Sequence, residues 1–370
     1  MKHRSSCAVV ITLGAIGMLA GCALGGEELA ARSAPVPVWE KDNPILPLPA
    51  SPLGIATKLS DLPDPPTPGS VRLGRWLFYD KRLSADGTIA CASCHRPEYA
   101  FSEPTPVSTG IRGQKGGRKA PSFVNQAWTA VPYFFWDGRA QSLEDQALGP
   151  MANPIEMGNT HVAILQTLTA NGYAPYFRQV FGAYEITNER VAKAIADYER
   201  TRLSGNSPWD RWKRGRDGSA VADVVKQGDA LFFGKADCSR CHLGQNFTDS
   251  AFHNLGVGWD SRTRRFKDAG RFAVTKADHD RGAFKTPALR DVTLHAPYMH
   301  DGSVPTLRAV VELYNKGGIP NPHLDRKIRP LRLTGDEIDA LVKFMEALEG
   351  EGYLDKPPNT FPGTRTERRR

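Results

Sequence analysis

Two copies of one short cysteine–histidine motif constrain this 370-residue chain more than any other feature. Cys-x-x-Cys-His occurs at residues 91–95 and again at residues 238–242. The chain has six cysteines, and the two outside these motifs are Cys7 and Cys22, near the beginning of the sequence. No cysteine remains for a structural disulfide, so the thiols of the folded body must serve another purpose.

The spacing within both motifs is typical of c-type haem attachment. The two thiols can bond to the two vinyl groups on one porphyrin edge, and the adjacent histidine then lies under the iron as its proximal ligand. The predicted attachment residues are Cys91, Cys94 and His95 for one haem, and Cys238, Cys241 and His242 for the other. Two alternatives are weaker, because a thioredoxin-like pair needs no adjacent histidine and a four-cysteine zinc site leaves both histidines unexplained.

The first 22 residues predict export. Basic residues at positions 2–4 precede an apolar run that Leu19, Ala20, Gly21 and Cys22 close, a pattern typical of a bacterial lipoprotein signal peptide. We expect a protein on the periplasmic side of the cell envelope, either held by a lipid anchor at Cys22 or secreted to the periplasm. The apolar run is short for a transmembrane helix, and an uncleaved membrane anchor is the alternative.

Ten prolines between Pro35 and Pro68 favour an extended segment with few helices. A helix-and-loop pattern follows, with helical spacing of apolar residues over 186–198 and 224–233. Similar apolar and aromatic stretches precede the two haem motifs, which favours two small helical domains built on one plan. The expected organisation is a signal peptide at 1–21, a proline-rich tether at 22–69, a first haem domain at 70–210, a second at 211–355 and a basic tail at 356–370.

The formal net charge of +8 is a mild excess of basic residues. Such an excess can steer an acidic partner toward the protein. The sequence contains no nucleic-acid-reading motif and no basic helix, so nucleic acid is not an expected partner.

Four further stretches resemble the bacterial di-haem cytochrome c peroxidase family, which includes the MauG branch. They are Leu-Gly-Arg-Trp-Leu-Phe-Tyr-Asp at 73–80, Trp-Asp-Gly-Arg-Ala at 136–140, Asn-Pro-Ile-Glu-Met at 153–157 and Pro-Tyr-Met-His-Asp-Gly at 297–302. The resemblance covers roughly residues 60–350 and implies a mostly α-helical fold of two cytochrome-c-like domains, each with one covalent haem. It also implies hydrogen peroxide as substrate.

The resemblance implies that the N-terminal haem is the peroxide site. Gln146 and Glu156 match the family's distal residues, and a carboxylate there can move the proton that peroxide cleavage requires. Trp136 would relay charge between the haems. Many members keep a distal histidine at the position of Ile111, and no histidine occurs here between residues 96 and 160, so we expect the peroxide site to be open at rest.

The second axial ligand of the C-terminal haem separates the family's branches. Tyr314 stands at about the position where MauG has tyrosine and the cytochrome c peroxidases have methionine, while Met299 is the alternative ligand. A phenolate favours oxidised iron, whereas a soft methionine favours ferrous iron and electron uptake from a cytochrome.

Two departures from the family pattern stand out. MauG passes charge to its partner through a surface tryptophan, where this chain has Ala236, so Trp209, Trp212 or Trp259 would have to serve as the exposed aromatic instead. The family also places calcium between the haems, held partly by an asparagine. Lys119 stands at that position here, which argues against a calcium site without excluding one.

We therefore expect a MauG-like enzyme that reacts with hydrogen peroxide, forms a bis-Fe(IV) state and oxidises a tryptophan or tyrosine of a periplasmic partner protein. One alternative is a hydrogen peroxide reductase that receives electrons from a small cytochrome c. The other is a di-haem electron-transfer cytochrome without peroxide chemistry.

Overall fold

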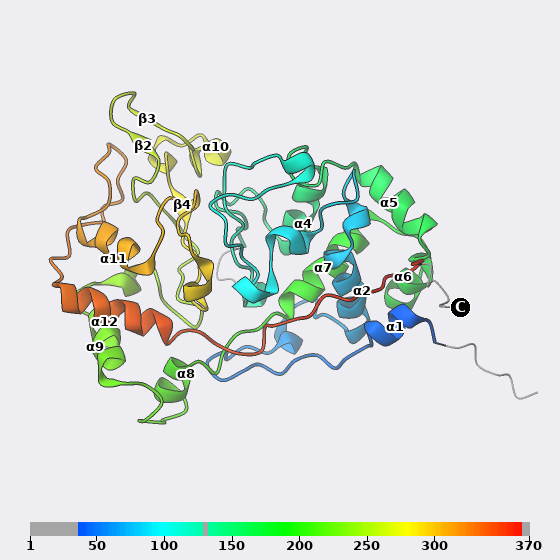
Figure 1. The fold of residues 1–370 in the computed structure, drawn as a ribbon, viewed down its shortest axis with the longest axis horizontal. Coiled ribbons are helices and arrows are strands. Elements are labelled where there is room, and N and C mark those ends of the chain that lie inside the picture. Colours follow the sequence, from blue (N-terminus) through cyan, green and yellow to red (C-terminus); the bar gives the residue numbers. More distant parts are fainter. Residues whose placement is uncertain (1–35, 129–131, 365–370) are drawn as a thin grey trace, which may run out of the picture. The chain divides into compact units, whose positions relative to one another are not determined.

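The computed structural model describes residues 36–128 and 132–364, which form mainly helices joined by long loops (Figure 1). The prediction of a mostly helical fold is confirmed. No helix in these two ranges is both long and apolar enough to cross a membrane. The predicted signal peptide at 1–21, the lipidation site Cys22 and the end of the basic tail lie outside the described residues.

The described residues form mostly α-helices and a few two-residue strands. The α-helices are α1 (Val38–Asp42), α2 (Pro68–Tyr79), α3 (Cys91–Cys94), α4 (Leu143–Ala152), α5 (His161–Ala170), α6 (Ala174–Phe181), α7 (Asn188–Arg200), α8 (Pro208–Lys213), α9 (Asp223–Phe233), α10 (Phe272–Thr275), α11 (Leu307–Asn315) and α12 (Gly335–Glu346). The strands are β1 (Phe252–His253), antiparallel to β4 (Phe284–Lys285), and β2 (Trp259–Asp260), antiparallel to β3 (Arg265–Phe266).

The first hydrophobic core forms where α2 crosses α7. Gly74 of α2 lies directly against the carbonyl oxygen of Ala194 in α7, where any Cβ would collide with the backbone. This close approach buries large side chains from both helices, including Trp76, Phe78 and Tyr198. Packing at this density means that the crossing tolerates little added volume.

The second core repeats the same arrangement with α9 and α12. Gly228 of α9 lies against the carbonyl oxygen of Ala340 in α12, again with no room for a Cβ. Phe232 and Phe344 pack across this crossing with ring centroids 4.7 Å apart. Each core therefore has a glycine of its first helix at the point of closest contact.

The proline-rich segment differs from the expected tether in its described part. Residues 37–69 lie on the folded body, where Ile55 and Leu59 are buried. The backbone N–H of Asn206 donates to the carbonyl oxygen of Leu53 at 2.7 Å. The segment also has hydrogen bonds of its own, such as that from the N–H of Ile55 to the carbonyl oxygen of Pro52 at 3.0 Å, so it is a folded part of the body.

The described part of the expected basic tail is also packed. Just before it, at the end of the expected second domain, Tyr353 belongs to the first core. The backbone N–H groups of Asn359 and Thr360 donate to the Asp42 carboxylate at 2.5 and 2.8 Å. The C-terminal segment, red in Figure 1, thus runs back from α12 across the first half of the chain.

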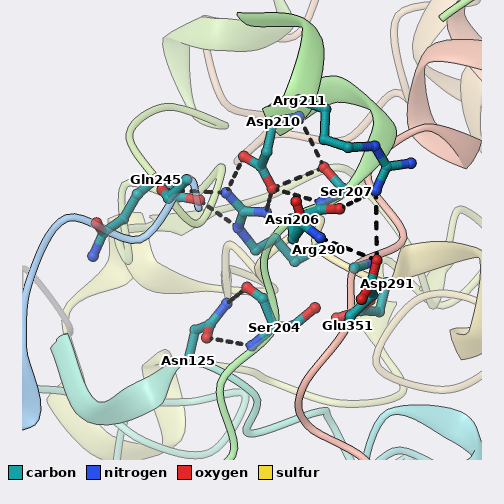
Figure 2. A network of polar contacts seen from close by, with 12 residues as sticks. Asn125, Ser204, Asn206, Ser207, Asp210, Arg211, Gln245, Arg290, Asp291 and Glu351 are labelled. Carbon is teal, nitrogen blue, oxygen red and sulfur yellow. Dashed lines mark hydrogen bonds and ion pairs between the residues drawn. The ribbon is translucent and has the colours of Figure 1, made fainter. Parts of the chain in front are cut away.

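A buried polar network fixes the segment that joins the two cores (Figure 2). Asp210 and Arg290 form a bidentate ion pair at 2.7 and 3.0 Å, and both side chains are almost fully buried. On the other side, the Asn125 amide bonds to both backbone groups of Ser204, at 2.8 and 2.9 Å. Removing one partner of such a pair leaves a buried charge without compensation, so the network holds the connection in one geometry.

Candidate functional site

Both Cys-x-x-Cys-His motifs line one cavity of about 820 Å³, and all six predicted attachment residues are in its wall. None of the four cysteines forms a disulfide. Burial raises the pKa of Cys91 and of Cys238 to about 12, so both are neutral. In the described part of the chain, the one cluster with metal-ligand geometry is Cys241, Asp249 and His253, which does not unite the four cysteines as the zinc alternative requires.

The two motif histidines are oriented in the same way. His95 Nδ1 lies 2.9 Å from the carbonyl oxygen of Phe101, and His242 Nδ1 lies 2.9 Å from that of Phe247. Donation from Nδ1 to these carbonyl oxygens leaves Nε2 as a lone-pair ligand for a metal. Burial lowers the pKa of both histidines, which keeps them in the neutral form that binds iron. Thiols, histidines and cavity therefore fit two c-type haems.

The carbonyl groups that orient these histidines belong to strained residues. Phe101 and Phe247 have φ angles of 58° and 52°, in the left-handed region that non-glycine residues seldom adopt. Both phenylalanines are buried, and such strain persists only where the surroundings enforce it. The same local device therefore positions the proximal ligand in each half.

The three residues predicted to act on the peroxide side are brought together in the wall of this cavity. Gln146 comes from α4, and Glu156 from the loop that follows it. Glu156 Oε1 accepts a hydrogen bond from Asn153 Nδ2 at 2.9 Å, and burial raises the pKa of its carboxyl group. Trp136 joins them, with its indole N–H donating to the carbonyl oxygen of Lys119 at 2.8 Å.

Ile111 has a structural role at the position of the family's distal histidine. Its side chain is buried, and its backbone N–H donates to the carbonyl oxygen of Glu156 at 2.8 Å. The residue thereby fixes the backbone that carries the distal carboxyl group. The openness of the peroxide site at rest stays a prediction.

Both candidate axial ligands of the C-terminal haem are in the cavity wall. Tyr314 comes from α11, and burial together with the nearby thiols of Cys238 and Cys241 raises the pKa of its phenol well above the ordinary value. Met299 lies in the loop before α11, with a φ of 73°. The choice between Tyr314 and Met299 stays a prediction.

The cavity wall contains ionisable residues that sequence reasoning missed. Glu199 is 4% exposed, its Oε2 has no donor among the described residues, and burial raises the pKa of its carboxyl group to about 8. Lys285 of β4 and His295 also line the cavity, with pKa values lowered by burial to about 8 and about 3. Glu199 follows Ile195 by one helical turn, so helical spacing in α7 could have placed it on the inward face.

The three tryptophans expected to pass charge to a partner protein differ in their exposure to solvent. Trp209 is only 6% exposed and donates its indole N–H to Asp229 at 2.7 Å, within the second core. The expectation of Trp209 as an exposed aromatic is therefore wrong, because α8 turns it inward. Trp212 and Trp259 are partly exposed. Ala236 is buried.

Comparison with known sequences identifies relatives over most of the chain. The family model for di-haem cytochrome c peroxidase matches residues 68–218. The methylamine utilization protein MauG of Methylorubrum extorquens is 41% identical over 290 residues, 78% of this chain and 80% of that protein. MauG of Methylophilus methylotrophus is 36% identical over 80% of this chain and 87% of its own length. The cytochrome c551 peroxidase of Nitrosomonas europaea is 36% identical over 75% of this chain and 79% of its own length.

Solved structures show the same fold. A MauG-like protein associated with microbial copper homeostasis superposes with a TM-score of 0.72 at 30% identity, over 86% of this chain and 97% of the other. The diheme peroxidase BthA from Burkholderia thailandensis gives a TM-score of 0.68 at 23% identity, over 88% and 96% of the two chains, and shows the fold alone. With MauG proteins and peroxidases alike among its relatives, this chain belongs to the di-haem cytochrome c peroxidase family and is a haem oxidoreductase that acts on peroxide.

Proposed function

We propose that this enzyme uses hydrogen peroxide to oxidise a tryptophan or tyrosine side chain of a partner protein, in the manner of MauG. The observation that carries the proposal is Tyr314, which lies in the cavity wall beside Cys238 and Cys241. A phenol at this place supplies a hard oxygen ligand, which favours oxidised iron over ferrous iron. The second haem would then store oxidising power and would be a poor acceptor of electrons from a cytochrome.

The first half contains a carboxyl group that can transfer a proton. When bound, the haem at His95 would activate peroxide, and the protein's part is to move one proton between the peroxide oxygens. Glu156 suits this task because burial raises the pKa of its carboxyl group, and Asn153 fixes its orientation. Gln146, in the same wall, can hydrogen-bond to a small polar ligand.

Trp136 is held by both halves of the molecule. Its indole N–H bonds to Lys119 in the first half, and its carbonyl oxygen accepts from the backbone N–H of Lys285 in the second half at 2.8 Å. An aromatic ring fixed in this way between the two motifs supports a role in passing charge from one haem to the other.

A second candidate function has its own support. Met299 also lines the cavity, and the relatives include cytochrome c peroxidases as well as MauG proteins. If Met299 is the ligand, the enzyme would instead reduce peroxide with electrons from a small cytochrome c.

We also propose that the protein is exported and lipid-anchored at Cys22 on the periplasmic side of the envelope. The lipoprotein-type pattern at residues 19–22 supports this location. Loss of membrane association in a Cys22→Ala variant, measured by cell fractionation, is the expected result, and unchanged association would contradict the anchor.

Replacing Tyr314 tests the proposed function. Tyr314→Phe should remove the low-spin ferric signal of the C-terminal haem in electron paramagnetic resonance, and Tyr314→Met should raise its reduction potential. In both variants partner oxidation should fail while peroxide still reacts at the His95 haem. Met299→Leu is the matched control and should leave the signal in place. If Met299→Leu removes the low-spin signal and Tyr314→Phe does not, the cytochrome-fed peroxidase is the better assignment.

A further inference from the structure

Lys119 contacts several segments where the two halves meet. It is 4% exposed and lies in the wall of the shared haem cavity. Its backbone N–H donates to the carbonyl oxygen of His300 at 2.8 Å, and its own carbonyl oxygen accepts from the Trp136 indole at 2.8 Å. One residue thus contacts the loop of the second half and the tryptophan between the two motifs.

The side-chain ammonium group of Lys119 lies among oxygen atoms. Nζ donates to the carbonyl oxygen of Glu103 and to that of Thr105, the latter at 3.2 Å. The Glu103 carboxylate is buried beside this loop and accepts from Ser108 Oγ at 2.5 Å and from the Ala120 N–H at 2.6 Å. Backbone carbonyl oxygens near a carboxylate are also the ligands that calcium prefers.

We propose that the Lys119 ammonium group is a built-in cation that replaces the calcium ion of related enzymes, so that this enzyme needs no divalent metal between its haems. Calcium requires six to eight oxygen ligands. Here the ammonium group already bonds to two of the local carbonyl oxygens, and its charge repels a second cation. In residues 36–128 and 132–364, the one cluster with metal-ligand geometry lies elsewhere, at Cys241, Asp249 and His253. The calcium that the family implies therefore does not fit this chain.

The lysine remains a cation under ordinary conditions. Burial lowers its pKa to about 8, against an opposing effect of the Glu103 carboxylate, so the ammonium form prevails at pH 7. Its neighbour His295 is neutral, since burial and then the charge of Lys119 lower the histidine pKa to about 3. Lys119 is thus a positioning residue: its charge holds the loop, and its carbonyl group holds the Trp136 indole.

The first experiment uses the purified holoenzyme. Elemental analysis should find no stoichiometric calcium, and neither excess EGTA nor added calcium should change its thermal midpoint or the absorption spectra of its haems. One equivalent of tightly bound calcium per chain, or a fall in the thermal midpoint with EGTA, would overturn the proposal.

Two substitutions then test whether the ammonium occupies a cation site. Lys119→Asn and Lys119→Met should each lower the thermal midpoint in EGTA by roughly 5–10 °C, because the carbonyl oxygens lose their donor. Added calcium should restore stability in Lys119→Asn, which leaves space and an amide oxygen, and should not do so in Lys119→Met.

The matched control is Lys115→Asn, the same change at an exposed lysine of the same loop whose Nζ bonds to Thr109 Oγ1 at 2.6 Å. It should behave as the wild type does, with and without calcium. A Lys119→Asn variant that is indifferent to calcium, or a Lys119→Met variant as stable as the wild type, would refute a cation site. If Lys119→Asn does not fold, the metal content of the wild type still decides the question.

Discussion

The first and second halves of this molecule share the helix crossing and the way in which the motif histidine is oriented. They contribute different residues to the cavity wall. Each half has a helix crossing closed by a glycine, Gly74 or Gly228. Each orients its histidine with the carbonyl group of a phenylalanine in left-handed conformation. To the cavity wall, the first half contributes the carboxyl groups of Glu156 and Glu199, and the second contributes Tyr314 and Met299.

Under the proposed function, this difference is what would give the two haems separate tasks. The shared features attach and orient a haem without deciding what it does. Under the proposed function, Glu156 and Glu199 in the first half suit proton transfer, because burial raises their carboxyl pKa. In the second half, the phenol of Tyr314 or the thioether of Met299 would supply a further ligand.

The largest expected effect comes from removing one haem at a time. Cys91→Ala with Cys94→Ala should reduce the mass by one haem and abolish the reaction with peroxide. Cys238→Ala with Cys241→Ala should also reduce the mass by one haem, yet leave the peroxide-binding spectrum of the other haem in place. Mass spectrometry of denatured protein and optical titration with peroxide make the comparison. Equal loss of peroxide reactivity in both variants would show that the halves do not divide their tasks as proposed.

An intermediate effect is expected from the acid at the peroxide side. Glu156→Gln keeps the shape of the side chain and the bond to Asn153 but removes the titrating proton. Stopped-flow spectroscopy should show the peroxide reaction slowed by roughly 10²–10⁴-fold, with haem content unchanged. Glu98→Gln, at an exposed position of the first half, is the control. An unchanged rate in Glu156→Gln would make that carboxyl group a structural one.

The smallest effect concerns stability and pH. The Glu199 carboxyl group has a pKa raised by burial to about 8, whereas in the unfolded chain it titrates near its ordinary value of 4.5. Between these values the unfolded chain releases this proton and the folded protein keeps it, so Glu199 lowers stability progressively as pH rises from about 4.5 to about 8.

Glu199→Gln should remove this dependence of stability on pH. The thermal midpoints of variant and wild type should therefore diverge between pH 5 and pH 8 in favour of the variant, and run parallel above pH 8. Glu185→Gln, at a side chain 74% exposed, should show no such divergence. A constant difference between Glu199→Gln and wild type at every pH would mean that Glu199 is ionised in the folded protein.

Features that depend on local sequence could be predicted. The six residues that the Cys-x-x-Cys-His motifs predicted for haem attachment lie in the wall of one cavity, and helical spacing anticipated α7 and α9 to within a few residues. The distal candidates Gln146 and Glu156 came from position within the resemblance, and the structure places both in the cavity wall with His95.

Features that depend on distant contacts could not be predicted. Proline content favoured an extended tether at 22–69, but in its described part Ile55 and Leu59 are buried, which the local sequence does not reveal. Trp209 was expected on the surface, and only the turn of α8 toward the second core buries it. The bonds of the Lys119 ammonium group likewise depend on a loop whose path the sequence does not specify.

The return of the C-terminal segment to the first half has a consequence for the order of biogenesis. Tyr353 completes the first core, and Asp355 bonds to Arg75 at 2.8 Å and to Tyr198 at 2.7 Å. The first half is therefore incomplete until the chain has been synthesised as far as Asp355. We expect the thiols of the first motif to stay accessible to a haem-attaching enzyme until Tyr353 and Asp355 dock on the first core.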